Sequence, residues 1–113
     1  MSGCLCVSNS YEKKFYLNPK FEKLPSQVKQ ELQILSVLYT EEVGGILMLS
    51  FEDDGTLFLT PLSDEGDLLY DEIGSALKIG QIRREHQDLF ESLEAYYRMV
   101  ILGQNGGSDA FSD

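Results

Sequence analysis

Residues 46–62 read ILMLSFEDDGTLFLTPL, in which two runs of alternating apolar and polar residues flank an acidic turn that ends in glycine. This pattern predicts a β-hairpin. A two-residue loop at Asp54 and Gly55 would mix apolar and polar side chains on both faces of the hairpin. A three-residue loop, with Gly55 in the left-handed conformation, opposes Phe51 to Leu57 and collects the apolar side chains on one face. We therefore predict the three-residue loop.

The predicted register divides the hairpin into two faces. One face holds Leu47, Leu49, Phe51, Leu57 and Leu59, and the other holds Met48, Ser50, Glu52, Thr56, Phe58 and Thr60. Met48 and Phe58 are the large apolar side chains of the second, mostly polar face. A small sheet leaves such a face open, so Met48 and Phe58 are candidate interface residues that a second copy of the chain would cover.

Helices are predicted on both sides of the hairpin, because apolar residues recur there at helical spacing. The first spans residues 26–43, from a cap at Ser26 to a stop at Gly44. The second spans residues 67–79, with Asp67 as its cap. The side chains of this second helix that we expect to face inward are Leu69, Ile73, Ala76 and Leu77.

A third helix is predicted over residues 81–102. Its apolar residues follow each other in alternating steps of four and three, which is a heptad-like seam: Ile82, His86, Leu89, Leu93, Tyr96 and Val100. Such a seam is typical of a helix that packs along another helix. The seam from His86 to Val100 is therefore a second candidate interface, at His86, Leu89, Leu93, Tyr96 and Val100.

The first 25 residues allow two interpretations. Residues 13–17 (KKFYL) favour a strand, whereas the spacing of Tyr11 and Phe15 also suits a short helix. The elements together predict an α+β domain over residues 1–102, in which a small antiparallel sheet packs against about three helices. Residues 103–113 (GQNGGSDAFSD) have the composition of a disordered tail.

Charge is distributed unevenly along the chain of 113 residues, whose net charge is -10. Residues 31–77 hold eleven acidic residues and no Lys or Arg, whereas residues 1–30 hold five Lys and two Glu. The acidic balance argues against binding to nucleic acid or to an anionic membrane, because phosphate groups need a basic surface. The acidic block is either a solvated face or a surface that selects a basic partner or a cation.

The two cysteines, Cys4 and Cys6, are too close in the chain for an unstrained mutual disulfide, and on a strand they would share a face. With His86 as the only histidine, they also lack partners for a metal site. We expect free thiols in a reducing cytoplasm. The chain also shows neither a signal peptide pattern nor a stretch of about 18 apolar residues, so no membrane segment is expected.

No catalytic, cofactor-binding or metal-binding set is predicted. His86 lies on an apolar seam, so we interpret it as a packed residue and not as a general base. The acidic turns do not fit a calcium-binding loop. In a loop that starts at Ser50, Pro61 takes the place of the last ligand, and in a loop that starts at Pro61 it takes the place of the first. One alternative stays open, an acidic pocket for a cation or small molecule, conceivably in an enzyme, formed by Asp64, Glu65, Asp71 and Glu72.

The segments YEKKFYLN, LPSQVKQELQILSVLYTEEVGGIL, FEDDGTLFL and LLYDEIGSALKIGQIRREHQDLFESLEAYYRMVIL occur in this order. This order resembles a family of small uncharacterised proteins of clostridia and related Gram-positive bacteria, over residues 4–102. The resemblance implies a bacterial cytoplasmic protein, and it implies no activity, cofactor or catalytic residue.

The sequence therefore favours a non-enzymatic interaction module over the acidic pocket. Self-association, as a homodimer or larger homo-oligomer, is expected through the last helix or the open face of the sheet. The basic first third of one copy could then meet the acidic middle of another.

Overall fold

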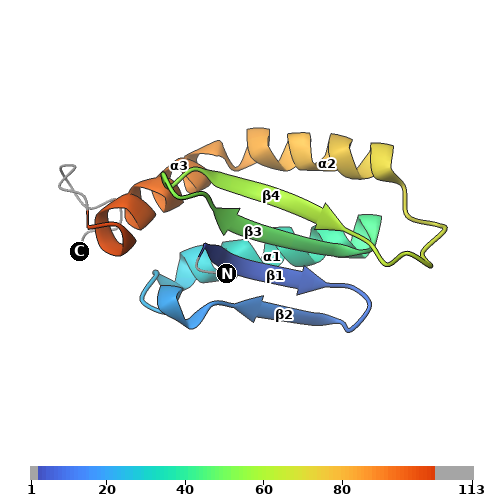
Figure 1. Cartoon of the computed structure of the whole chain (residues 1–113), viewed down its shortest axis with the longest axis horizontal. Helices are drawn as coiled ribbons and strands as arrows, with labels where there is room; N and C mark the ends of the chain where they lie inside the picture. Colours follow the sequence, from blue (N-terminus) through green and yellow to red (C-terminus); the bar gives the residue numbers. More distant parts are fainter. Residues whose placement is uncertain (1–2, 104–113) are drawn as a thin grey trace.

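A computed structural model of the chain describes residues 3–103. Within them the chain forms a four-stranded antiparallel sheet in the order β2-β1-β3-β4 (Figure 1). The strands are β1 (Cys4–Asn9), β2 (Lys14–Leu17), β3 (Ile46–Phe51) and β4 (Leu57–Leu62). The α+β class is confirmed. The predicted tail lies almost wholly outside the described residues, and a single domain over residues 1–102 stays a prediction.

The hairpin has the predicted register. Phe51 lies opposite Leu57, and Leu49 lies opposite Leu59. Gly55 has a φ of 92°, and the Glu52 N–H donates to the Thr56 carbonyl oxygen at 2.8 Å. The three-residue loop is therefore confirmed.

The N-terminal segment adds two strands to the hairpin. The strand interpretation of residues 13–17 is confirmed as β2, and the alternative of a short helix there is wrong. β1 was not predicted, and it lies in the sheet between β2 and β3. The sheet thus has one strand more than the hairpin and the predicted strand over residues 13–17 would form together.

A bulge in β1 corrects the expected placement of the cysteines. Cys4 lies opposite Ser50 and Cys6 lies opposite Leu49, so the register shifts between them. Leu5 and Cys6 are both fully buried, whereas Cys4 is partly buried. The two free thiols therefore lie on opposite faces of the sheet, because an extra residue breaks the alternation of side chains.

Helix α1 (Ser26–Val43) has the predicted bounds. Its first residue follows Pro25, which lies at the cap position without a side-chain hydrogen bond, so Ser26 is not the cap. At the other end Gly44 and Gly45 adopt φ values of 84° and 72°, which few residues other than glycine adopt easily. These two glycines turn the chain directly from α1 into β3.

The C-terminal helices differ from the prediction. Helix α2 (Glu72–Glu85) replaces the expected helix over residues 67–79, and it runs through Gly80 without a break. The expected helix over residues 81–102 is divided into the end of α2, helix α3 (Gln87–Tyr96) and a π-helical turn, η2 (Tyr97–Ile101).

Three side-chain interactions, two of them between residues far apart in the sequence, explain these corrections. Asp71 caps α2, because its carboxylate accepts the Gly74 N–H at 3.0 Å. Asp67 is engaged elsewhere, since it accepts the hydroxyl of Tyr11 at 2.6 Å. The break between α2 and α3 is at His86, whose φ of -120° and ψ of 26° depart from helical values and whose Nδ1 lies 3.0 Å from Glu31 Oε2.

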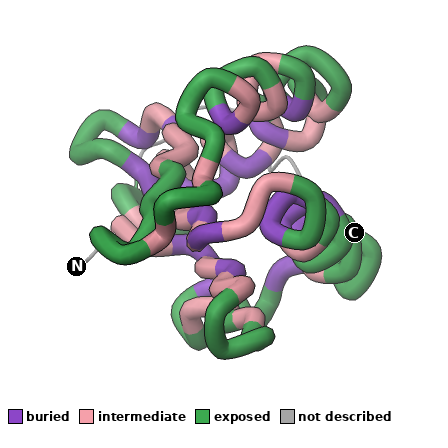
Figure 2. The backbone as a smooth tube through the Cα atoms, turned by 90° about the vertical axis from the view of Figure 1, so that its right-hand side faces the viewer, coloured by how far each residue is buried: buried purple, intermediate pink, exposed green. Residues whose placement is uncertain are grey.

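All the helices lie on one side of the sheet. Figure 1 shows α1 behind the strands and α2 and α3 beside β4, and Figure 2 shows buried residues between the helices and the strands. Ring centroids of Phe51 and Tyr97 are 4.2 Å apart, and Phe21, in the 3-10 turn η1 (Pro19–Phe21), stacks on both. The fully buried large side chains include Leu5, Phe21, Leu32, Tyr39, Leu47, Leu49, Leu57 and Leu93.

One edge of the sheet is blocked. In β4, the residues whose N–H groups pair with β3 alternate with Leu57, Leu59 and Pro61. The backbone nitrogens of these three residues therefore point away from β3. The Leu57 N–H donates to the Glu94 carboxylate at 2.7 Å, and proline has no N–H. The β4 edge thus keeps the Leu59 N–H as its outward donor.

None of the helices in residues 3–103 combines the length and the apolar composition that crossing a membrane requires.

Candidate functional site

The face of the sheet opposite α1 carries apolar side chains in register. Tyr16, Val7, Met48 and Thr60 form one row across all four strands. Phe58 lies one row further along, opposite Ser50. We call this surface the open sheet face and define it by Val7, Tyr16, Ile46, Met48, Phe58 and Leu62. Tyr16 and Leu62 are exposed and the other four are partly buried.

The open sheet face is almost free of charge. Among the described residues of the four strands, Lys14 is the one charged side chain at a position of this face, in the row with Asn9 and Ile46. Figure 1 shows this face toward the viewer, with α1 behind the sheet and α2 and α3 beside β4. A chain with a net charge of -10 therefore presents a nearly neutral apolar sheet surface.

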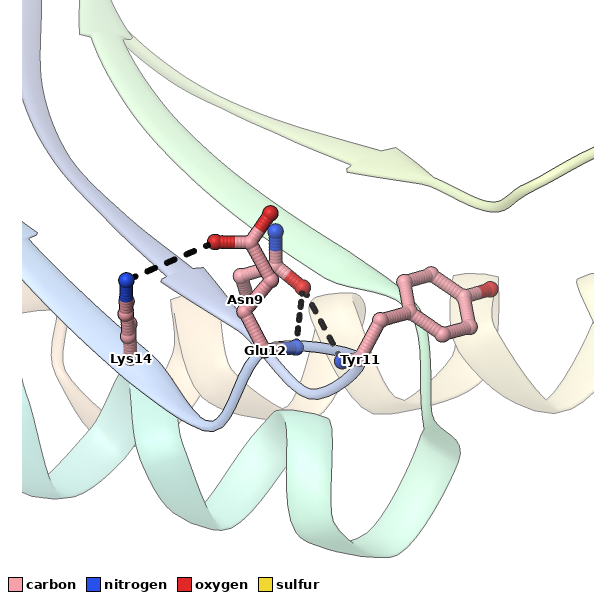
Figure 3. Close-up of polar contacts among 4 residues, drawn as sticks. All are labelled: Asn9, Tyr11, Glu12 and Lys14. Atoms are coloured by element: carbon pink, nitrogen blue, oxygen red, sulfur yellow. Dashed lines mark hydrogen bonds and ion pairs between the residues drawn. The ribbon is translucent and has the colours of Figure 1, made fainter.

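The turn between β1 and β2 borders this face and is held by local hydrogen bonds (Figure 3). Asn9 Oδ1 accepts the N–H groups of Tyr11 at 2.9 Å and of Glu12 at 3.1 Å. Glu12 Oε1 lies 4.0 Å from Lys14 Nζ. The Tyr11 ring points away from these contacts (Figure 3), and its hydroxyl accepts the Asp64 N–H at 3.1 Å. The Tyr11 hydroxyl thereby connects the β1–β2 turn to the loop before α2.

A second apolar surface lies on the outer side of the helices. Leu68, Leu69, Ile73 and Leu77 are between 70% and 95% exposed. Ile34 and Leu38 of α1 are each more than half exposed. We call the surface formed by the first four residues the outer helix face and define it by Leu68, Leu69, Ile73 and Leu77. Three of these residues, Leu69, Ile73 and Leu77, were expected to face inward, which is wrong.

Helix α2 is held by its opposite side, where its buried residues are Ser75 and Ile82. The Ser75 hydroxyl lies 2.5 Å from that of Tyr39, and the Tyr70 hydroxyl donates to Ser75 at 2.8 Å. Burial raises the pKa of the Tyr39 phenol above its ordinary value. These hydroxyl contacts hold Ser75, a small residue of α2, against α1. Ile73 and Leu77 lie on the other side of α2 and therefore face solvent.

The predicted interface residues fall in two separate places. Met48 and Phe58 lie together on adjacent strands of the open sheet face. Leu93 and Tyr96 of the seam are buried in the core, and Leu89 is partly buried against it. His86 lies at the junction of α2 and α3, and Val100 is exposed on η2. The structure thus does not join the seam to the open sheet face.

The four acids of the alternative pocket are not gathered into one site. Asp64 lines a shallow pocket with Tyr11, whereas Asp71 caps α2 and Glu72 begins it. Glu65 is exposed in the loop between them. Within residues 3–103 no three His, Cys, Asp or Glu side chains lie close enough to hold a metal ion.

Two grooves open elsewhere on the described surface. One, of about 570 Å³, lies between the β1–β2 hairpin and α1 and includes Lys13, Phe15 and Val37. The other, of about 360 Å³, lies between α2 and α3 and includes Arg84 and Glu94. No histidine lines either groove, so neither pairs a nucleophile with an imidazole base.

Comparison with known proteins yields one match. The model of a family of unknown function (DUF6145) matches residues 2–105. No curated protein and no solved structure matches the chain.

Proposed function

The chain belongs to this family of unknown function, DUF6145, and we propose that it is a protein-interaction module that self-associates through the open sheet face. The observation that carries the proposal is the row of Tyr16, Val7, Met48 and Thr60, an apolar and nearly uncharged strip across the sheet. The resemblance to bacterial cytoplasmic proteins and the two free thiols support a reducing cytoplasm as its location.

A second copy suits this face because of its charge. In a two-fold dimer the same patch meets itself, so a patch with an excess of one sign of charge repels its copy. The open sheet face has one charged position, Lys14, and Glu12 lies beside that lysine. Self-contact therefore carries little repulsion here, although the chain as a whole is strongly acidic.

Regular strands make this face suitable for packing against a copy of itself. Two sheets pack face to face at about 10 Å, with side chains of both sheets interdigitating. Met48, on the inner strand β3, would lie near the middle of such a contact, and Phe58, on the edge strand β4, would lie beside it. Removing these side chains from water on both copies stabilises the dimer in proportion to the apolar area buried.

Sedimentation velocity over a range of concentrations tests the proposal. We expect the wild-type chain to dimerise and Met48→Lys to weaken the dimer by roughly 100-fold, because each dimer carries the buried charge twice. Leu102→Lys is the matched control, since it adds the same charge at an exposed residue after η2 and should leave the dimer intact. A wild-type chain that stays monomeric up to roughly 1 mM would overturn the proposal.

The alternative function, a cation or small-molecule binder that uses an acidic pocket, has less support. Asp64, Glu65, Asp71 and Glu72 serve a loop and a helix start, and their carboxylates do not converge. The interaction proposal needs no such convergence.

A further inference from the structure

We propose that the outer edge of β2 is a second contact site, and that its occupant is the β2 of a second copy of the chain. The two four-stranded sheets would then join edge to edge into one continuous sheet. This inference goes beyond the proposed contact between open sheet faces, because it uses the backbone at the edge of the sheet. Figure 1 shows β2 at the border of the sheet, with no helix or strand of residues 3–103 beyond it.

The backbone of β2 carries hydrogen-bonding groups that point away from β1. The Asn18 N–H donates to the Leu5 carbonyl oxygen at 2.9 Å, so these two residues are a hydrogen-bonded pair. Hydrogen-bonded residues alternate along an antiparallel pair of strands. The N–H and carbonyl groups of Phe15 and Leu17 therefore point outward, and within residues 3–103 they have no hydrogen-bond partner.

The two edges of the sheet differ in this respect. At β4 the Glu94 carboxylate accepts one outward N–H, and Pro61 supplies none. β2 contains no proline, and no side chain of residues 3–103 accepts its outward N–H groups. An edge with free N–H and carbonyl groups is a template for another strand. β2 is therefore the edge at which this sheet accepts one.

One antiparallel register of two β2 strands satisfies all the outward groups. With Phe15 of one copy opposite Leu17 of the other, each outward N–H meets an outward carbonyl oxygen. Phe15 opposite Phe15 would place Leu17 against Lys13, whose φ of 55° is not that of a strand. Leu17 opposite Leu17 would place Phe15 against Pro19, which has no N–H. The two-fold axis of the pair therefore passes beside Tyr16.

This register also matches the side chains on both faces of the sheet. On the open sheet face Tyr16, which is 51% exposed, lies opposite its own copy. On the face toward α1, Phe15 of one copy lies opposite Leu17 of the other. Apolar and aromatic pairs across two strands stabilise their pairing. The row of Tyr16, Val7 and Met48 then continues without a break into the row of the second copy.

The charges of β2 are compatible with a second copy. Lys14 lies opposite Asn18, and the two copies of Lys14 are offset by about 13 Å along the strands. This offset exceeds the Debye length of about 8 Å at physiological salt, so their repulsion is largely screened. Glu12 Oε1, 4.0 Å from Lys14 Nζ, reduces it further. A second copy thus brings the matching apolar pattern by symmetry and places no like charges opposite each other.

A disulfide at the two-fold axis is the probe of this contact. In the proposed register the Cα atoms of Tyr16 and its copy form a non-hydrogen-bonded pair about 4.5 Å apart, which a disulfide can bridge. The Tyr16→Cys chain at about 1 mM with a mild oxidant should form covalent dimers on a non-reducing gel. All chains carry Cys4→Ser. Cys6 is kept, because burial raises the pKa of its thiol to about 12 and leaves it unreactive.

Two matched comparisons locate the contact. Lys14→Cys places a thiol on the same face, but about 13 Å from its copy, and should cross-link at least about tenfold less than Tyr16→Cys. Within the Tyr16→Cys chain, Leu17→Pro removes an outward N–H that β1 does not use, whereas Leu17→Ala keeps it. The proline variant should cross-link at least about tenfold less than the alanine variant. Thermal unfolding checks that each variant remains folded.

Three outcomes would overturn the inference. Lys14→Cys could cross-link as readily as Tyr16→Cys, or Leu17→Pro as readily as Leu17→Ala. The Tyr16→Cys chain could also form no covalent dimer at about 1 mM, which would leave the edge to a strand of another protein.

The same probe separates this contact from the contact between open sheet faces. Sheets packed face to face are about 10 Å apart, which is too far for this disulfide. Met48→Lys, added to the Tyr16→Cys chain, weakens the face contact and should leave the cross-link unchanged. Failure of one proposal is therefore distinguishable from failure of the other.

Discussion

The open sheet face and the outer helix face both expose apolar side chains, but they differ in the charge of the residues around them and in the elements that carry them. The first is nearly uncharged and lies on strands that hydrogen-bond to their neighbours. The second adjoins acids such as Asp71 and Glu72 and lies on α2 and the loop before it, and the buried residues of α2 are Ser75 and Ile82. The comparison teaches that two apolar surfaces of one chain can differ in the charge around them, and a partner of either surface has to match that charge.

The largest expected effect separates the two sides of β3. Leu49→Ala removes a fully buried side chain from the side that packs on α1 and should lower the free energy of unfolding by about 2–5 kcal/mol. Met48→Ala, the adjacent residue on the open sheet face, should cost less than about 1 kcal/mol in the monomer. Urea unfolding at low concentration measures both. Equal losses would mean that Met48 is already covered within the chain.

The corner between α1 and β3 should give the next largest effect. A methyl group on Gly45 would lie 2.8 Å from Tyr70 Cε1 and would also collide with the Leu62 carbonyl oxygen. Gly45→Ala should therefore cost roughly 2–4 kcal/mol, whereas Gly44→Ala, with open space around it, should cost roughly 1–2 kcal/mol for its left-handed backbone alone. If the two variants unfold alike, the Leu62 carbonyl and the Tyr70 ring move aside from the added methyl group without cost.

The hydroxyl contacts between α1 and α2 should give a smaller effect. Tyr39→Phe leaves the Ser75 and Tyr70 hydroxyls without this partner and should cost about 1–2 kcal/mol in thermal or urea unfolding. Tyr16→Phe, which removes an exposed hydroxyl from the open sheet face, is the matched control and should be neutral.

The same tyrosine predicts a dependence on pH. Burial raises the pKa of Tyr39 in the folded chain, so above about pH 10 the unfolded chain loses a proton that the folded chain keeps. The contribution of Tyr39 to stability is therefore complete below pH 10 and falls as the pH rises toward the pKa of this phenol in the folded state. Tyr39→Phe should make this fall less steep, and an unchanged slope would assign it to other groups.

The smallest expected effect concerns the ion pair between the helices. Glu42→Gln should lower stability by less than about 0.5 kcal/mol, since the Lys78–Glu42 pair is partly exposed, and the loss should vanish at high salt. Glu41→Gln serves as its control on the same turn. A loss from Glu42→Gln that persists at high salt would show that α2 is held by more than its hydroxyl contacts and apolar side.

The hairpin and α1 could be predicted because their determinants are local. Only one register puts Leu47, Leu49, Phe51, Leu57 and Leu59 on a single face, and glycines end α1 directly. β1 could not be predicted, because its bulge turns both Leu5 and Cys6 inward and destroys the alternation that marks a strand. The start of α2 depends on whether Asp67 or Asp71 is the cap, and a hydrogen bond from Tyr11, 56 residues away, decides it.

Of the two surfaces, one could be predicted from the sequence and the other could not. Met48 and Phe58 could be placed on an open face from alternation alone. The outer helix face was missed because Ile73 and Leu77 recur at the spacing of core residues, and periodicity does not tell which apolar stripe is covered. The small residues Gly74, Ser75 and Ala76 were the available signal, since Ser75 marks the side of α2 that approaches α1.

The blocked β4 edge has a consequence for growth of an assembly. A sheet that can recruit strands at both edges can add chains without end and form a fibre. Here Glu94 and Pro61 occupy one edge, and the other, β2, is four residues long. Any pairing of β2 with the β2 of a second chain uses up the free edge of both, so growth of one continuous sheet through its edges stops at two chains.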